Sequence, residues 1–143
     1  MESMSKIEAV LFDLDGTLLD SFPDFLASLE NININSSSKK IDESIVRANV
    51  SDGSSKLLKL VFDINIDDED FDEHKRIFLN EYEKNILMHG NLFLGVSDLL
   101  NFLLDKKIPY GIVTNKPRKY TEIILKKSSL LRQSKVVICC DDG

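Results

Sequence analysis

The chain has 143 residues and a formal net charge of −6 at pH 7, and 43% of its residues are hydrophobic and 29% charged. This is ordinary globular composition, and the length is sufficient for one hydrophobic core. The negative charge argues against nucleic acid as a partner. No apolar run approaches the ~18 residues of a membrane span, and the N-terminus lacks the apolar stretch of a signal peptide, so we expect a cytoplasmic protein without a membrane partner.

The first expected element is a buried strand that ends in two carboxylates. Residues 9–12 are apolar, Asp13 and Asp15 follow, and a glycine then lets the chain turn. Open α/β sheets bind ligands at the carboxyl ends of their strands, which places both acids at the mouth of a site. A magnesium ion would relieve their repulsion, because it takes one or two carboxylates together with phosphate and water. A turn with two solvated acids is the alternative, and a calcium loop is disfavoured because Thr17 and Leu19 stand where further acids should follow.

Residues 20–88 favour helices over strands. Apolar side chains at i, i+3, i+4 and i+7 predict a helix from Phe22, with Asp20 or Ser21 as its cap. An acidic run at the start of the last helix of this region agrees with the helix dipole. The expected helices cover residues 22–29, 45–50, 56–62 and 67–86. We therefore predict an inserted, all-helical domain.

A second strand, at residues 108–113, also ends in a polar cluster, which consists of Thr114, Asn115 and Lys116. Pro117 then suits the start of a helix, where its missing N–H costs nothing. Such a cluster alone is typical of a polar loop, but here it is a second strand end that carries polar side chains. Roughly ninety residues separate the two clusters, far more than the dozen that a crossover between parallel strands requires.

Two further helices and a third strand complete the expected pattern. Ser97 can cap the helix that precedes the second strand. A helix from Tyr120 to about Leu131 and a strand at residues 135–140 follow it. Cys139 and Cys140 are adjacent in that strand and therefore point to opposite faces, which favours reduced core thiols. The expected buried stripe of the first of these helices is Leu99, Leu100, Leu103 and Leu104.

The segment Phe-Asp-Leu-Asp-Gly-Thr-Leu-Leu-Asp-Ser, residues 12–21, resembles the first motif of the haloacid dehalogenase superfamily, in its phosphoglycolate phosphatase form. The resemblance implies a Rossmann-like α/β core with a parallel sheet. It implies that Asp13 is the nucleophile that forms an aspartyl-phosphate, a role for which a carboxylate is competent. It also implies that Asp15 protonates the leaving alcohol and later activates water. A side-chain oxygen of Asp13 and the backbone carbonyl of Asp15 would bind Mg²⁺.

The Thr-Asn-Lys-Pro segment is similar to the second motif of the same family. This implies that Thr114 donates to a phosphate oxygen, with Asn115 and Lys116 beside it at the phosphate edge.

The resemblance also implies a domain division, with a core of residues 1–19 and 89–143 and a helical cap of residues 20–88. Such a cap would close over the site and exclude water. Arg47 stands where a cap arginine precedes a Val-Gly-x-Gly turn, although Ser51 replaces the first glycine. Arg47 could bind a substrate carboxylate with its forked guanidinium, and a solvent-exposed arginine is the alternative.

The third and fourth motifs of the family, a lysine and a pair of acids, and strands four and five of its core have no counterpart before Gly143. We therefore expect a C-terminally truncated fragment that is inactive as given. In the family's strand order the strand ending at Asp13 would then be a bare sheet edge, and we expect self-association through it.

Two classes of function remain. The first is a magnesium-dependent phosphomonoester hydrolase that acts on a small phosphorylated metabolite such as 2-phosphoglycolate. A pyrophosphatase or a sugar-phosphate mutase with the same cap is the alternative within that class, and a dehalogenase is disfavoured because it has no use for Asp15. The second class is a catalytically incomplete fragment or binding module.

Overall fold

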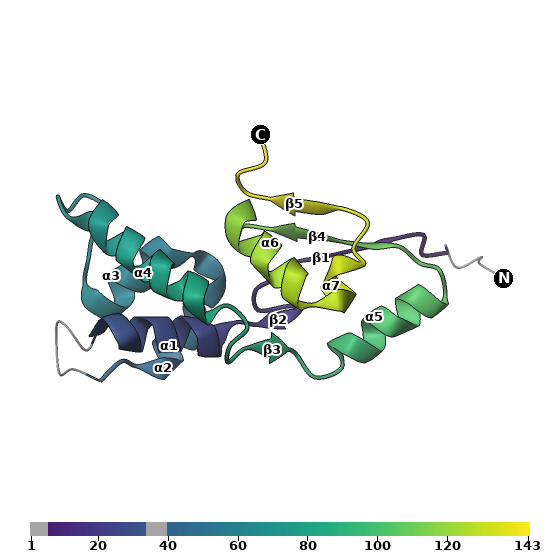
Figure 1. The fold of residues 1–143 in the computed structure, drawn as a ribbon, viewed down its shortest axis with the longest axis horizontal. Coiled ribbons are helices and arrows are strands. Elements are labelled where there is room, and N and C mark those ends of the chain that lie inside the picture. The colour runs from purple at the N-terminus through teal and green to yellow at the C-terminus, as the bar shows by residue number, and fades with distance from the viewer. Residues whose placement is uncertain (1–5, 34–39) are drawn as a thin grey trace. The chain divides into compact units, whose positions relative to one another are not determined.

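The computed structural model describes residues 6–33 and 40–143, which form two compact units. Unit 1 comprises the residues up to Leu18 together with Leu92–Gly143, and unit 2 comprises Leu19–Asn91. The middle of the chain thus forms a compact unit of its own (Figure 1). From the sequence, residues 20–88 are expected to form a cap, and the role of unit 2 as a cap stays a prediction. None of the helices in the described ranges is long and apolar enough to cross a membrane.

Unit 1 is built on a three-stranded parallel sheet in the order β1-β4-β5 (Figure 1). The strands are β1 (Val10–Phe12), β4 (Tyr110–Thr114) and β5 (Val137–Cys139). The fold is therefore α/β with a parallel sheet, as the sequence predicted. β1 pairs with β4 and lies at the edge of this sheet, which confirms the expected position of the strand before Asp13.

The two faces of the sheet differ in burial because successive side chains of a strand point to opposite sides. Tyr110, Ile112 and Thr114 are buried, and the Tyr110 hydroxyl donates to the carbonyl of Leu130. On the other face Leu11 lies opposite Gly111, and Leu11 is 63% exposed. The other exposed apolar residues of this face are Val113, Val136 and Ile138.

Three helices complete unit 1: α5 (Val96–Asp105), α6 (Arg118–Lys127) and α7 (Ser129–Arg132). The single helix expected at residues 120–131 is thus wrong. Ser128 is extended between α6 and α7, and its hydroxyl accepts a hydrogen bond from the Leu131 amide as an N-cap.

The expected cap of α5 was also wrong, and its expected buried stripe was only half right. The helix begins directly after Gly95, which has a φ of 89°, so Ser97 lies inside the helix and does not cap it. Of the four residues in the expected buried stripe, Leu100 and Leu103 are buried as predicted, whereas Leu99 and Leu104 are exposed. The buried side chains of α5 are Val96, Leu100 and Leu103.

Between β2 and β3, the described elements of unit 2 are helices (Figure 1). Its core forms where α1 packs on α4, and there the Phe25 and Tyr82 rings stack with centroids 4.2 Å apart. The elements are α1 (Phe22–Asn33), α2 (Glu43–Asn49), a 3₁₀ turn η1 (Val50–Asp52), α3 (Ser54–Phe62) and α4 (Phe71–Asn85).

Two details of the helix starts differ from expectation. The Ser21 hydroxyl is buried without a hydrogen-bond partner in the described structure, so it does not cap α1. The acidic run expected to open the last helix lies mostly before it, because Asp68 accepts a hydrogen bond from the Asn65 amide in a turn and α4 begins only at Phe71.

The chain crosses between the units twice, at β2 (Leu19–Asp20) and β3 (Asn91–Leu92), and these two strands pair. This pair was not predicted, because a strand of two residues is too short to show an alternating pattern in the sequence. Within unit 2, Asp24 at the start of α1 fixes the returning chain. Its buried carboxylate accepts hydrogen bonds of 2.9 Å from the backbone amides of Leu87, His89 and Gly90.

Candidate active site

Two acidic side chains follow β1 in a tight turn. Leu14 is fully buried and anchors this turn, and its carbonyl accepts from the amides of Thr17 and Leu18. Asp13, one residue before the anchor, is exposed, and its Oδ1 accepts from the Leu14 amide at 2.8 Å. Asp15, one residue after it, is 9% exposed. The turn thus presents one carboxylate to solvent and withdraws the other into the unit.

The polar cluster after β4 lies beside this turn because β1 and β4 are neighbouring parallel strands, with Phe12 opposite Ile112. Thr114 is buried, and its hydroxyl accepts from the Lys116 amide at 3.1 Å. Asn115 is exposed in the same turn, and Lys116 is buried. The structure therefore brings five of the six candidate residues to adjacent strand ends.

A buried ion pair joins the two turns. Lys116 Nζ lies 3.0 Å from Asp15 Oδ2, and the two side chains are 4% and 12% exposed. Buried charges require such partners, because removing a charge from water is costly. The sequence placed Lys116 at the phosphate edge, and the structure shows in addition that its ammonium binds Asp15.

A second polar cluster holds the turn after β5 against the start of α6. The Arg118 guanidinium bonds the Asp142 carboxylate at 2.6 and 2.7 Å, Glu122 at 2.9 Å and the Val137 carbonyl at 2.7 Å. The Arg118 amide also donates to Asp141. The hydrogen bond to Arg118 lowers the pKa of Asp142 to about 2. Sequence reasoning missed this cluster, although an arginine opening one helix and paired acids after the next strand were its signal.

Burial raises the pKa of the Cys139 thiol, which is consistent with the expected small core residue. Cys140 beside it is exposed and also free, so of this pair only Cys139 is a core thiol.

The donor set after β1 fits magnesium better than a metal with many protein ligands. In the part of the chain that the structure describes, no group of three or more His, Cys, Asp and Glu side chains gathers as a metal site. Magnesium is commonly held by one or two carboxylates, with phosphate and water as its other ligands. The exposed carboxylate of Asp13 can supply a side-chain oxygen, whereas the carboxylate of Asp15 is bound to Lys116.

Arg47, the sixth candidate, belongs to α2 in unit 2. Its guanidinium carbon lies 3.9 Å from the centroid of the Phe22 ring, and Nη1 lies 3.9 Å from Asp20 Oδ1. Its side chain is 57% exposed. Arg47 therefore lies at the end of unit 2 where the chain enters from β2, with more than half of its side chain exposed.

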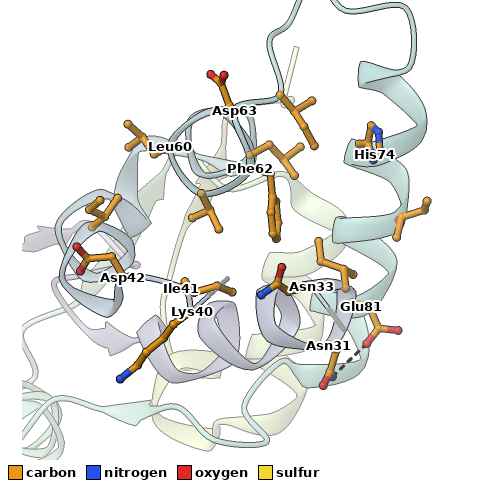
Figure 2. Close-up of a pocket in the computed structure, with 16 residues that line it drawn as sticks. Asn31, Asn33, Lys40, Ile41, Asp42, Leu60, Phe62, Asp63, His74 and Glu81 are labelled. Carbon is orange, nitrogen blue, oxygen red and sulfur yellow. Dashed lines mark hydrogen bonds between the residues drawn. The ribbon is translucent and has the colours of Figure 1, made fainter. Parts of the chain in front are cut away.

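A cavity of about 820 Å³ lies within unit 2, between α1, α2, α3 and α4 (Figure 2). Figure 2 shows Phe62 pointing into it from α3. The polar groups at its rim are engaged nearby: Asp42 binds Ser44, His74 binds Asp70, and Glu81 binds Asn31. None of the six candidate residues lines this cavity, and its polar groups do not converge on a common point as a catalytic site requires.

Comparisons with known proteins agree with the geometry. The haloacid dehalogenase-like hydrolase family matches residues 10–143. An N-acetylmuramic acid 6-phosphate phosphatase of Pseudomonas putida is 32% identical over 136 residues, which is 95% of this chain and 61% of the relative. A phosphoglycolate phosphatase of Xanthomonas campestris pv. campestris is 36% identical over 130 residues, 91% of this chain and 58% of the relative. The chain thus spans less than two thirds of the length of these relatives.

Among solved structures, the fold is similar to that of a predicted phosphoglycolate phosphatase from Haemophilus somnus. The TM-score is 0.80 at 22% sequence identity, and the match covers 99% of this chain and 66% of the other. At this identity the likeness shows the fold.

Proposed function

This chain belongs to the haloacid dehalogenase-like hydrolase family, and from that membership we propose that its protein is a magnesium-dependent phosphomonoester hydrolase acting through an aspartyl-phosphate. One observation carries the proposal. Asp13, Asp15, Thr114 and Lys116 meet at the carboxyl ends of two adjacent parallel strands, where α/β sheets bind ligands.

The proposed reaction has two steps. In the first, which requires Asp15 in its protonated form, a carboxylate oxygen of Asp13 attacks phosphorus, the bond to the leaving oxygen breaks, and Asp15 gives its proton to that oxygen. In the second, Asp15 takes a proton from water, which attacks the phosphorus of the aspartyl-phosphate and releases inorganic phosphate and free Asp13. Thr114 orients the phosphoryl group through its hydroxyl. Magnesium, bound by Asp13 and the Asp15 carbonyl, would neutralise phosphate charge.

The substrate class follows from the chemistry that the relatives' substrates share. N-acetylmuramic acid 6-phosphate and phosphoglycolate, the substrates named for the relatives, each carry a carboxylate besides the phosphate. We propose that the protein acts on a small phosphorylated carboxylic acid in the cytoplasm. Arg47 supports this proposal, because its side chain is largely exposed and a guanidinium can bind a carboxylate through two hydrogen bonds.

The test compares the chain with a longer version, in which the remaining C-terminal part of the Pseudomonas putida relative follows Gly143. We expect the longer protein to release phosphate from one of the two substrates, with loss of activity in EDTA and in Asp13→Asn. Asp98→Asn is the matched control, since Asp98 is an exposed acid on α5 of the same unit. Phosphate release that survives Asp13→Asn would contradict the proposed nucleophile, and release of phosphate only from pyrophosphate would favour a pyrophosphatase.

A further inference from the structure

The ion pair between Lys116 and Asp15 differs from the surface pairs of this chain. Lys56 and Asp52, for example, lie one turn apart around the start of α3, and their side chains are 51% and 46% exposed. The Lys116–Asp15 pair instead connects the ends of two strands and is almost completely buried. A buried pair of this kind is weak evidence for stability, because desolvation offsets much of its attraction. Its position at the strand ends points to a role in ligand binding.

The local backbone fixes where the Lys116 side chain starts, and a lysine side chain is flexible beyond that point. Thr114 accepts the Lys116 amide and so holds the turn, while the side chain beyond it has four rotatable carbons. The ammonium has three donors, and one of them is within hydrogen-bond distance of Asp15 Oδ2. A phosphate monoester that binds at Thr114 brings a charge close to −2 to the same strand ends. It therefore attracts the ammonium more strongly than a single carboxylate does at equal distance.

We propose that Lys116 holds Asp15 in the substrate-free protein and turns to the phosphate when a phosphorylated substrate binds, so that phosphate binding releases the Asp15 side chain. Lys116 is thus a positioning residue, which restrains Asp15 until the site is occupied. The identity of the ligand rests on the proposed function, but the exchange of partners can be measured without turnover.

The first measurement uses the 143-residue chain and inorganic phosphate as the probe, in metal-free buffer. Nuclear magnetic resonance follows the Thr114 amide, the Lys116 ammonium nitrogen and the Asp15 carboxyl carbon during the titration. We expect all three signals to shift with one common affinity, and the signals of Lys56 and Asp52 to stay unchanged. A shift of the Thr114 amide with no change at the Asp15 carboxyl overturns the proposal, as does the absence of any shift at Thr114.

The second measurement is a double-mutant cycle on phosphate affinity. If Asp15 competes for Lys116, Asp15→Asn should tighten phosphate binding by about tenfold, the factor expected for one charge-assisted hydrogen bond. The same substitution in a Lys116→Met background should change the affinity by less than about twofold. Equal gains in both backgrounds would indicate plain charge repulsion between Asp15 and phosphate, and would overturn the exchange of partners.

Two results separate this inference from the proposed function. Release of Asp15 by phosphate in a protein that hydrolyses neither substrate would leave the inference standing and remove the function. Hydrolysis by the longer protein, together with an Asp15 carboxyl signal that does not respond to phosphate, would support the proposed function and overturn this inference. If Lys116→Met fails to fold, the phosphate titration of the unsubstituted chain still tests whether phosphate releases Asp15.

Discussion

Replacing Asp24 with alanine tests whether a single carboxylate fixes the returning chain of unit 2. This side chain is 1% exposed and accepts three backbone hydrogen bonds of 2.9 Å from the segment after α4. The returning segment packs tightly against the start of α1, because a Cβ on Gly90 would lie 2.6 Å from Asp24 Oδ2 and 2.7 Å from the Asp20 carbonyl oxygen. Alanine therefore removes the acceptor without offering a replacement.

The expected loss follows from the burial of each donor. Hydrogen bonds to charged groups contribute about 1.5–3 kcal/mol each, so an unscreened sum would reach about 4.5–9 kcal/mol. His89 is exposed and Leu87 half-buried, so water can replace the carboxylate at their amides, whereas Gly90 is buried and its N–H would be left without an acceptor. We therefore expect Asp24→Ala to lower the free energy of unfolding by about 3 kcal/mol.

The assay is urea unfolding followed by circular dichroism, with hydrogen exchange read at the three amides. Asp72→Ala is the matched control, since Asp72 is also a first-turn acid, in α4, but is exposed. Asp72→Ala should lower the free energy of unfolding only by the lost interaction of Asp72 with the helix dipole, about 0.3–1 kcal/mol. Asp24→Asn should be intermediate, because its amide oxygen still accepts from His89 and Gly90 while its NH₂ group faces the Leu87 N–H.

The reasoning would be refuted by an Asp24→Ala variant within about 0.5 kcal/mol of Asp72→Ala, the ordinary range for a surface substitution. Unchanged hydrogen exchange at Gly90 would refute it independently, because that amide is the buried one.

Three further predictions concern other parts of the chain. In the longer protein, Arg47→Met should raise KM for substrates with a carboxylate but leave hydrolysis of p-nitrophenyl phosphate unchanged. Arg118 holds the pKa of Asp142 at about 2 against an ordinary 3.8, so this pair should stabilise the fold above pH 3.8 and lose its effect as the pH falls toward 2. Asp142→Asn should remove that acid-dependent part of thermal stability, measured by circular dichroism. The chain should self-associate through β1 in sedimentation, and Leu11→Lys on this strand should shift it toward monomer; a monomeric unsubstituted chain would contradict this.

The positions of the candidate residues could be predicted because the apolar run of each strand stops close to the end of that strand. The apolar runs before Asp13 and Thr114 stop abruptly, and the structure ends β1 at Phe12 and β4 at Thr114. The edge position of β1 could also be predicted, from the strand order of the family. The chemical roles of these residues stay predictions.

The contacts of the site could not be predicted, because they depend on which strands are neighbours and on the exact turn geometry. The pair between Lys116 and Asp15 exists only because β1 and β4 lie side by side. The cap of α5 was misplaced for a local reason: Gly95 adopts a positive φ, and the helix therefore starts before Ser97.

The pairing of β2 with β3 has a consequence for how this architecture can vary. The two ends of a 73-residue insertion, Leu19–Asn91, are hydrogen-bonded neighbours rather than distant points on the surface. A segment whose ends meet in this way can be exchanged for another of any length without moving the strands on either side, as in domains that tolerate insertion at adjacent termini. Evolution, or an engineer, could thus replace unit 2 by exchanging the chain at both strands of this ladder, while the strand ends that carry Asp13 and Thr114 stay where they are.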